Sequence, residues 1–154
     1  MLLIYQPTGE KREAKREPVS DFEYKVIKKN KRFPSFDWAK ERSFEVYKIR
    51  LKDSEIILGL ISLIDHTDER WIKINLLQSS VENIGADKEY KNIAGCLIAY
   101  ACRLSFLRGY GGCVALHPKT ELVAHYMHVY GFENAGLHLF TELKNSGNLI
   151  KKYL

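Results

Sequence analysis

The residues best suited to chemistry in this chain of 154 residues lie in the segment Glu89–Cys96. A strand-like run, Trp71–Ser79, precedes this segment, and a helical pattern that continues to about Phe106 follows it. A turn of small residues between a strand and a helix presents free backbone N–H groups at the positive end of the helix dipole. The pattern predicts an anion site that suits a pyrophosphate. The alternative is that Ala94 and Gly95 only let the helix pack closely on a sheet.

The elements after this turn extend the pattern. A short strand, Cys113–Leu116, leads to a second helix that ends in Tyr126-x-x-x-Tyr130-Gly131-Phe132. From about Ile56 to Phe140 this order resembles the acetyl-CoA-dependent N-acetyltransferases of the GNAT superfamily. The phosphate motif of that family reads Arg or Gln, two variable residues, Gly, one variable residue, then Gly or Ala.

This chain departs from the family motif at two positions. Glu89 stands where the family has a base or an amide, and Asn92 replaces the first glycine. Asn accepts positive φ better than most residues, so the turn can still form. Lys88 and Lys91 can compensate for the charge of Glu89.

The resemblance implies a set of residues that bind acetyl-CoA, the expected cosubstrate. It implies a sheet that opens between two parallel strands, with the pantetheine arm along the first of them. Lys119 stands where the family often has Asn facing the pantetheine, although a lysine there could instead meet a phosphate or point to solvent. The residues implied to hold the pyrophosphate through backbone N–H groups are Lys91, Asn92, Ile93, Ala94, Gly95 and Cys96. Those implied to pair with the pantetheine through their backbone are Leu76, Leu77 and Gln78.

Acetyl transfer from a thioester to an amine requires an amine that has lost its proton, a stabilised oxyanion and a proton for the leaving thiolate. Tyr126 matches the helix tyrosine that the family uses to protonate the thiolate; the alternative is a core aromatic. The general base is not identified. His117 is a candidate because histidine titrates nearest to neutral pH, but it could equally cap the following helix. Glu69 and Glu82 are weaker candidates. We expect no metal site, although His125 and His128 have helical spacing, because no third ligand is evident.

The elements that must position these residues predict an α/β (α+β) fold. We expect a mixed, mostly antiparallel sheet with a central splayed parallel pair and flanking helices. Alternation of apolar and charged residues at Tyr47–Leu51 predicts a half-buried strand, and Ile56–Ile64 predicts a strand buried on both faces. Gly131 is expected to end the second helix in the left-handed conformation. At the carboxyl end we expect strands at Leu137–Glu142 and Asn148–Tyr153, joined by a hairpin turn at Asn145-Ser146-Gly147.

We expect a single N-acetyltransferase-like domain over residues 1–154, with its core at 43–154. In the less regular segment 1–42, a short strand is expected at Leu2–Tyr5 and a break at Pro18–Asp21. Acids and bases alternate over residues 10–17, which predicts a solvated helix or a mobile arm; contact with RNA is the alternative.

The composition limits the partners and the location. No run of 18 apolar residues appears, so we expect no membrane span, and Met1–Tyr5 lacks the basic leader of a signal peptide. Cys96, Cys102 and Cys113 lack metal-like spacing and suit a reducing cytoplasm. We therefore expect a cytoplasmic enzyme that transfers acetyl from acetyl-CoA to a primary amine of a small molecule or protein. Nucleic acid is disfavoured as a partner, and the sequence is compatible with a homodimer. The alternatives are a non-catalytic acyl-CoA-binding module and an RNA-binding or interaction domain.

Overall fold

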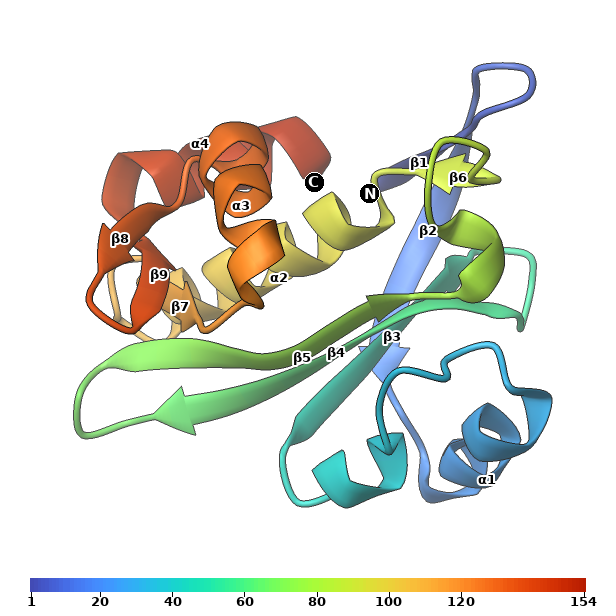
Figure 1. Ribbon diagram of the computed structural model, residues 1–154, viewed down its shortest axis with the longest axis horizontal. Helices are drawn as coiled ribbons and strands as arrows, with labels where there is room; N and C mark the ends of the chain where they lie inside the picture. The colour runs from blue at the N-terminus through green and yellow to red at the C-terminus, as the bar shows by residue number, and fades with distance from the viewer. The chain divides into compact units, whose positions relative to one another are not determined.

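The computed structural model describes residues 1–154, which divide into two compact units (Figure 1). Unit 1 comprises Met1–Ser62 and Leu76–Leu97, and unit 2 comprises Leu63–Asn75 and Ile98–Leu154. Three elements run through both units: β4 (Ile57–His66), β5 (Trp71–Ser79) and α2 (Ile93–Leu107). The sequence predicted all three within two residues of these bounds. That residues 1–154 form a single domain stays a prediction.

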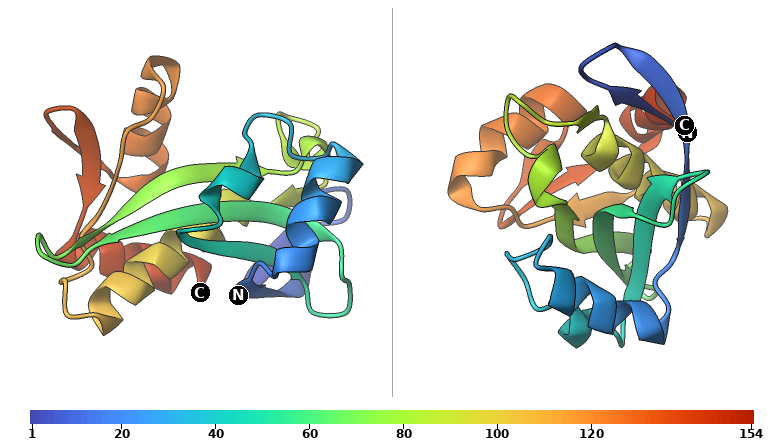
Figure 2. Two further views of the ribbon diagram at one scale, coloured as in Figure 1. Left: turned by 90° about the horizontal axis from the view of Figure 1, so that it is seen from below. Right: turned by 90° about the vertical axis from the view of Figure 1, so that its right-hand side faces the viewer.

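The sheet of unit 1 has the strand order β6-β1-β2-β3-β4-β5. It adds β1 (Leu2–Tyr5), β2 (Glu10–Pro18), β3 (Glu45–Leu51) and β6 (Tyr90–Lys91). The pairs β1–β2, β1–β6 and β2–β3 are all antiparallel. The strand expected at Leu2–Tyr5 is confirmed, and it forms the N-terminal hairpin with β2, which is blue in Figure 2.

The prediction of a solvated helix or mobile arm over residues 10–17 is wrong. These residues form β2, which pairs with β1 on one side and with β3 on the other. The charged residues are accommodated because successive side chains of a strand point to opposite faces, so that exposed and half-buried positions largely alternate along β2.

One face of the unit 1 sheet is covered by α1 (Asp21–Asn30) and a short 3₁₀ helix, η1 (Trp38–Glu41). The predicted break at Pro18–Asp21 is confirmed, since Glu23 accepts hydrogen bonds from the N–H and hydroxyl of Ser20 at the start of α1. The buried cluster on this face joins both helices to the sheet through Tyr24, Ile27, Phe33, Trp38, Val46, Ile57 and Leu60.

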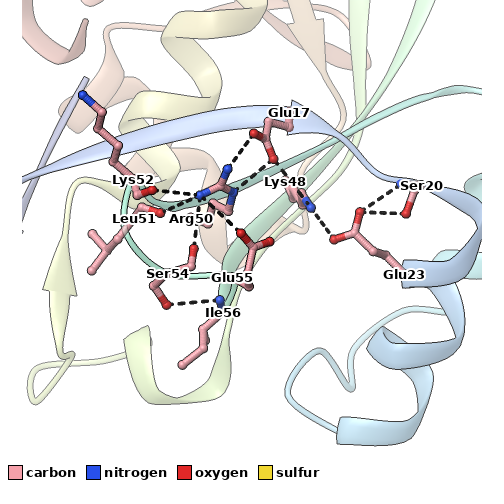
Figure 3. Close-up of polar contacts among 10 residues, drawn as sticks. All are labelled: Glu17, Ser20, Glu23, Lys48, Arg50, Leu51, Lys52, Ser54, Glu55 and Ile56. Atoms are coloured by element: carbon pink, nitrogen blue, oxygen red, sulfur yellow. Dashed lines mark hydrogen bonds and ion pairs between the residues drawn. The ribbon is translucent and has the colours of Figure 1, made fainter.

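The packing of α1 and β2 around β3 buries charged residues that the sequence predicted to face solvent. The strand is present, but the charged positions that should face solvent are buried: Lys48 is 6% exposed and Arg50 is 8% exposed. Figure 3 shows the reason. Arg50 binds both carboxylate oxygens of Glu17, at 3.0 Å from Nε and 2.7 Å from Nη2. Lys48 contacts Glu23 and lies 3.7 Å from Glu17. Buried charges must be paired, and α1 and β2 supply the partners.

The sheet of unit 2 has the order β4-β5-β7-β9-β8, with β7 (Val114–Leu116), β8 (Glu133–Ala135) and β9 (His138–Thr141). The pair β5–β7 is parallel, whereas β7–β9 and β8–β9 are antiparallel. The mixed, mostly antiparallel sheet and its one parallel pair are therefore confirmed. The short outer strand β8 was not predicted.

The remaining elements of unit 2 are η3 (Thr120–Leu122), α3 (Val123–Tyr130) and α4 (Leu143–Tyr153). Gly131 ends α3 at φ 70°, as predicted. The predicted strand at Asn148–Tyr153 and its hairpin turn are wrong, because these residues belong to α4. Ser146, Leu149 and Tyr153 are its buried residues, and their spacing is that of one helix face. The Ser146 hydroxyl lies 2.7 Å from the Gly112 carbonyl oxygen.

Candidate functional site

The predicted phosphate turn lies in unit 1, where β6 leads directly into α2. Asn92 has φ 78°, the left-handed conformation that a glycine would otherwise supply. The first hydrogen bond of the helix runs from the N–H of Cys96 to the carbonyl of Asn92, at 2.9 Å. The N–H groups of Ile93, Ala94 and Gly95 precede this bond, as the first-turn donors of a helix do. They form a compact set of donors for an anion.

Two of the six residues predicted to hold the pyrophosphate, Lys91 and Cys96, do not have the first-turn position of the other backbone donors. Lys91 lies in β6, where it pairs with Ile4. The N–H of Cys96 is already bonded within the helix, and its thiol is fully buried. Burial raises the pKa of the Cys96 thiol to about 12, so that sulfur stays protonated.

A cation that the sequence did not reveal lies beside the turn. Arg12 of β2 donates from Nη1 to the hydroxyl of Tyr90 at 2.7 Å, and its guanidinium lies 4.3 Å from the ring centroid of Tyr5. Arg12 also pairs with Glu10 at 3.2 Å. The exposed Glu89 is fixed through its backbone, which accepts from the N–H of Gln6 at 2.8 Å. Arg12 thus brings a positive charge next to a motif whose usual base is replaced by an acid.

A buried hydrogen-bond chain joins the end of β5 to the turn. Asn83 accepts from the N–H of Tyr90 at 2.7 Å and donates to the hydroxyl of Ser80 at 2.8 Å. Asn83 is 4% exposed and Ser80 fully buried. Leu76, Leu77 and Gln78, the predicted pantetheine residues, lie just before Ser80 in unit 1. The structure therefore brings both predicted parts of the acetyl-CoA site into one unit.

These pantetheine residues do not share one environment. Leu76 packs against the buried cluster beneath α1, and Leu77 is half-buried. Gln78 is buried, and its side-chain oxygen accepts from Trp38 Nε1 at 2.9 Å. In unit 2, the parallel pairing of β5 with β7 covers only Ile72–Ile74 and ends with β7 at Leu116. Since β5 continues to Ser79, its later residues lie beyond that pairing, as a splayed pair requires.

Tyr126 lies on α3 in unit 2, with its ring centroid 5.8 Å from that of Phe132 and 5.9 Å from that of Tyr130. Burial raises the pKa of Tyr126 above its ordinary value of 10.0. The phenol therefore stays protonated at neutral pH and is available as a proton donor.

The alternative that His117 caps the following helix is wrong, because Lys119 precedes η3 and Leu122 precedes α3 at the capping positions. His117 is exposed just after β7, and its ring centroid lies 5.9 Å from that of His138. The sequence did not single out His138. Lys119 is exposed to solvent.

The two weaker candidates for the general base belong to different units. Glu69 is exposed in unit 2 and lies 3.4 Å from Trp71 Nε1, whereas Glu82 forms an ion pair with Arg32 in unit 1. The structure contains no group of three His, Cys, Asp or Glu side chains arranged for a metal ion, and His125 and His128 have no third ligand.

None of its helices combines the length and apolar character that crossing a membrane demands.

No protein-family model matches the sequence, and no curated protein matches it. Solved structures do match. A mutant form of the spermidine/spermine N-acetyltransferase SpeG from Vibrio cholerae is 16% identical, with a TM-score of 0.64 over 88% of this chain and 97% of that chain. A point mutant of the AtaT toxin, bound to acetyl-CoA and the C-terminus of the antitoxin AtaR, is 11% identical. Its TM-score is 0.57 over 90% of this chain and 99% of that chain.

GCN5 from Tetrahymena is 9% identical, with a TM-score of 0.51 over 68% of this chain and 71% of that chain. The chain therefore has the fold of the GNAT acetyltransferases, as the sequence predicted.

Proposed function

We propose that the protein is an N-acetyltransferase that moves acetyl from acetyl-CoA to a primary amine. The observation that carries this proposal is the turn at Asn92, which has a left-handed backbone and is followed by the N–H groups of Ile93, Ala94 and Gly95 as the first-turn donors of α2. A turn of this kind, within a fold shared with N-acetyltransferases, supports a diphosphate-bearing cosubstrate.

The residues at the turn fit the diphosphate of acetyl-CoA. Three N–H groups at the positive end of α2 are suitable donors for its phosphate oxygens, and Arg12, which is bonded to Tyr90, would supply positive charge beside them. The backbone of Leu76, Leu77 and Gln78 would run beside the pantetheine. Acetyl-CoA supplies the activated acetyl thioester, and Tyr126 supplies a phenol proton for the sulfur that leaves.

The acceptor is proposed only as an amine. The similar proteins act on different acceptors: SpeG is a spermidine N-acetyltransferase, and another AtaT structure holds acetyl-methionyl-tRNA. The three cysteines of this chain are free, which suits a reducing compartment and supports a cytoplasmic location.

The first test is thermal stability with and without acetyl-CoA, with ATP and dephospho-CoA as controls. A ligand that binds only the folded state at 100 times its Kd stabilises it by about 2.7 kcal/mol. For a chain of this size each kcal/mol raises Tm by roughly 2–4 °C. We expect acetyl-CoA to raise Tm by several degrees, more than ATP does, and Asn92→Pro to weaken the effect. No shift at millimolar acetyl-CoA would refute the proposal.

Transfer is tested separately with radiolabelled acetyl-CoA and a panel of amines. We expect labelled product from at least one amine, and a lower kcat for Tyr126→Phe with an unchanged acetyl-CoA shift. Binding without transfer to any amine would favour the alternative, a non-catalytic acyl-CoA-binding module.

A further inference from the structure

One face of the unit 2 sheet gathers ionisable and aromatic side chains. The register aligns Lys73 with Ala115 and Phe140, and Ile74 with Leu116 and Leu139. Side chains alternate along a strand, so the two rows face opposite ways. The Ile74 row is buried. The other face carries Trp71 and Lys73 of β5, His138 of β9 and, one residue after β7, His117.

The rings on this face form a continuous row. His66, at the end of β4, stacks on Trp71 with centroids 4.3 Å apart and planes 10° from parallel. Trp71 meets His138 edge-on at 5.7 Å, and His138 lies 5.9 Å from His117. A pocket of about 180 Å³ opens beside the last two rings, with Thr120, Asn134 and Leu137 also in its wall.

The surroundings of His138 favour its neutral form. Burial lowers the pKa of His138 below the ordinary 6.5, and electrostatic interactions with Lys73 on β5, His117 after β7 and His66 on β4 act in the same direction. A neutral imidazole keeps an unprotonated nitrogen at neutral pH, which a general base needs.

The position of His138 along the sheet also suits a general base. Parallel pairing of β5 with β7 stops at Leu116, the residue before His117. Leu139, which pairs with Leu116, directly follows His138. Both histidines therefore stand at the point of the unit 2 sheet where the parallel strands cease to pair.

We propose that His138 is the general base that takes a proton from the ammonium group of the acceptor bound in this pocket. This inference rests on the proposed acetyl transfer. The neutral amine then forms the N–C bond to the acetyl carbonyl as the C–S bond breaks. Tyr126 gives its proton to the thiolate, the amide nitrogen loses its second proton to solvent, and the phenol and imidazole return to their starting forms by exchange with solvent.

The test compares wild type with His138→Gln, using His128→Gln on the exposed side of α3 as the matched control. Removing a general base lowers the rate about 10²–10⁴-fold. We expect His138→Gln to lower kcat at least 100-fold for an alkylamine, and to move the acidic limb of the kcat/KM profile to the higher pH at which the amine itself loses its proton. An aromatic amine is already neutral at the assay pH, so with that acceptor the variant should lose far less.

Three outcomes separate the possibilities. An unchanged acetyl-CoA thermal shift in His138→Gln, with selective loss for the alkylamine, supports the assignment. Equal loss for both amines, or a loss no larger than in His128→Gln, overturns it while the acetyltransferase proposal stands. Failure of the wild type to bind acetyl-CoA, or to acetylate either amine, overturns both.

Discussion

Replacing Gly59 with alanine would place a methyl group where α2 approaches β4. The new Cβ would lie 2.5 Å from Ile93 Cγ2, 3.1 Å from Ile49 Cγ2 and 3.2 Å from Leu97 Cδ1. The nearest atom is a branch methyl of a residue that is only 3% exposed, so it cannot swing into solvent. Because Ile93 directly follows Asn92, the strain falls on the start of the phosphate turn.

The expected cost follows from the packing. Inserting a methyl into a closely packed core costs about 1–3 kcal/mol. Urea unfolding, followed by tryptophan fluorescence, should show Gly59→Ala destabilised by this amount with an unchanged m-value. Gly147→Ala is the matched control. It makes the same chemical change in α4, where a Cβ meets nothing within 4 Å, and should stabilise by about 0.5–1 kcal/mol.

A double mutant tests the cause. Ile93→Ala alone should cost about 2–5 kcal/mol because it leaves a cavity. In Gly59→Ala/Ile93→Ala the new methyl occupies part of that cavity, so the double mutant should be more stable than the sum of the single changes predicts by about 1 kcal/mol or more. Additivity within about 0.5 kcal/mol would show that the two side chains do not collide and would refute the reasoning.

Three further results are expected. Asn92→Gly should keep both stability and acetyl-CoA binding, whereas Asn92→Ala should lose about 1–2 kcal/mol in urea unfolding because φ is positive; equal stability of the two would contradict the left-handed turn. Burial opposes ionisation of Glu23, but its hydrogen bonds, chiefly from Lys48, outweigh this and lower its pKa below 4.5. The stability it contributes is therefore present above pH 4.5 and lost as pH falls through the lower folded value, so Glu23→Gln should flatten that part of the pH dependence of the urea midpoint. Cys96 and Cys102 are buried, with pKa raised to about 12, and should react with a thiol reagent only after unfolding; rapid labelling of both in the native protein would disagree.

The elements that could be predicted from the sequence are those whose signal is local. Strands β4 and β5 are long apolar or alternating runs, and Gly131 ends α3 at a positive φ that only a few residue types favour. The helix α4 was missed because Asn145-Ser146-Gly147 has the composition of a turn. What makes it helical is tertiary: Ser146 bonds to Gly112 and packs beside Thr141, and neither contact is visible in the local sequence.

The residues of the candidate site likewise divide into those predicted from the local sequence and those that depend on tertiary contacts. Asn92 was placed in the turn by its match to the family motif, and the φ of 78° agrees with the tolerance of Asn for the conformation that a glycine would adopt there. The two buried hydrogen bonds of Asn83, to Ser80 and Tyr90, could not be predicted because they belong to no motif. His138 was placed in a predicted strand, but only the register of β9 on β7 shows that it lies beside His117.

We expect Arg12, on a distant strand, to compensate for the acid that stands at Glu89 in the motif. It lies 78 residues before Tyr90 and reaches it because β1 pairs with both β2 and β6. If Arg12 supplies the charge that Glu89 lacks, Arg12→Gln should weaken acetyl-CoA binding several-fold at low salt, and the difference should shrink as salt screens the charge. Lys11→Gln, the adjacent residue on the opposite face of β2, is the control. Equal weakening by both substitutions would mean that only general positive charge matters; unchanged binding in Arg12→Gln would mean that the three N–H groups of α2 hold the diphosphate without help from the N-terminal hairpin.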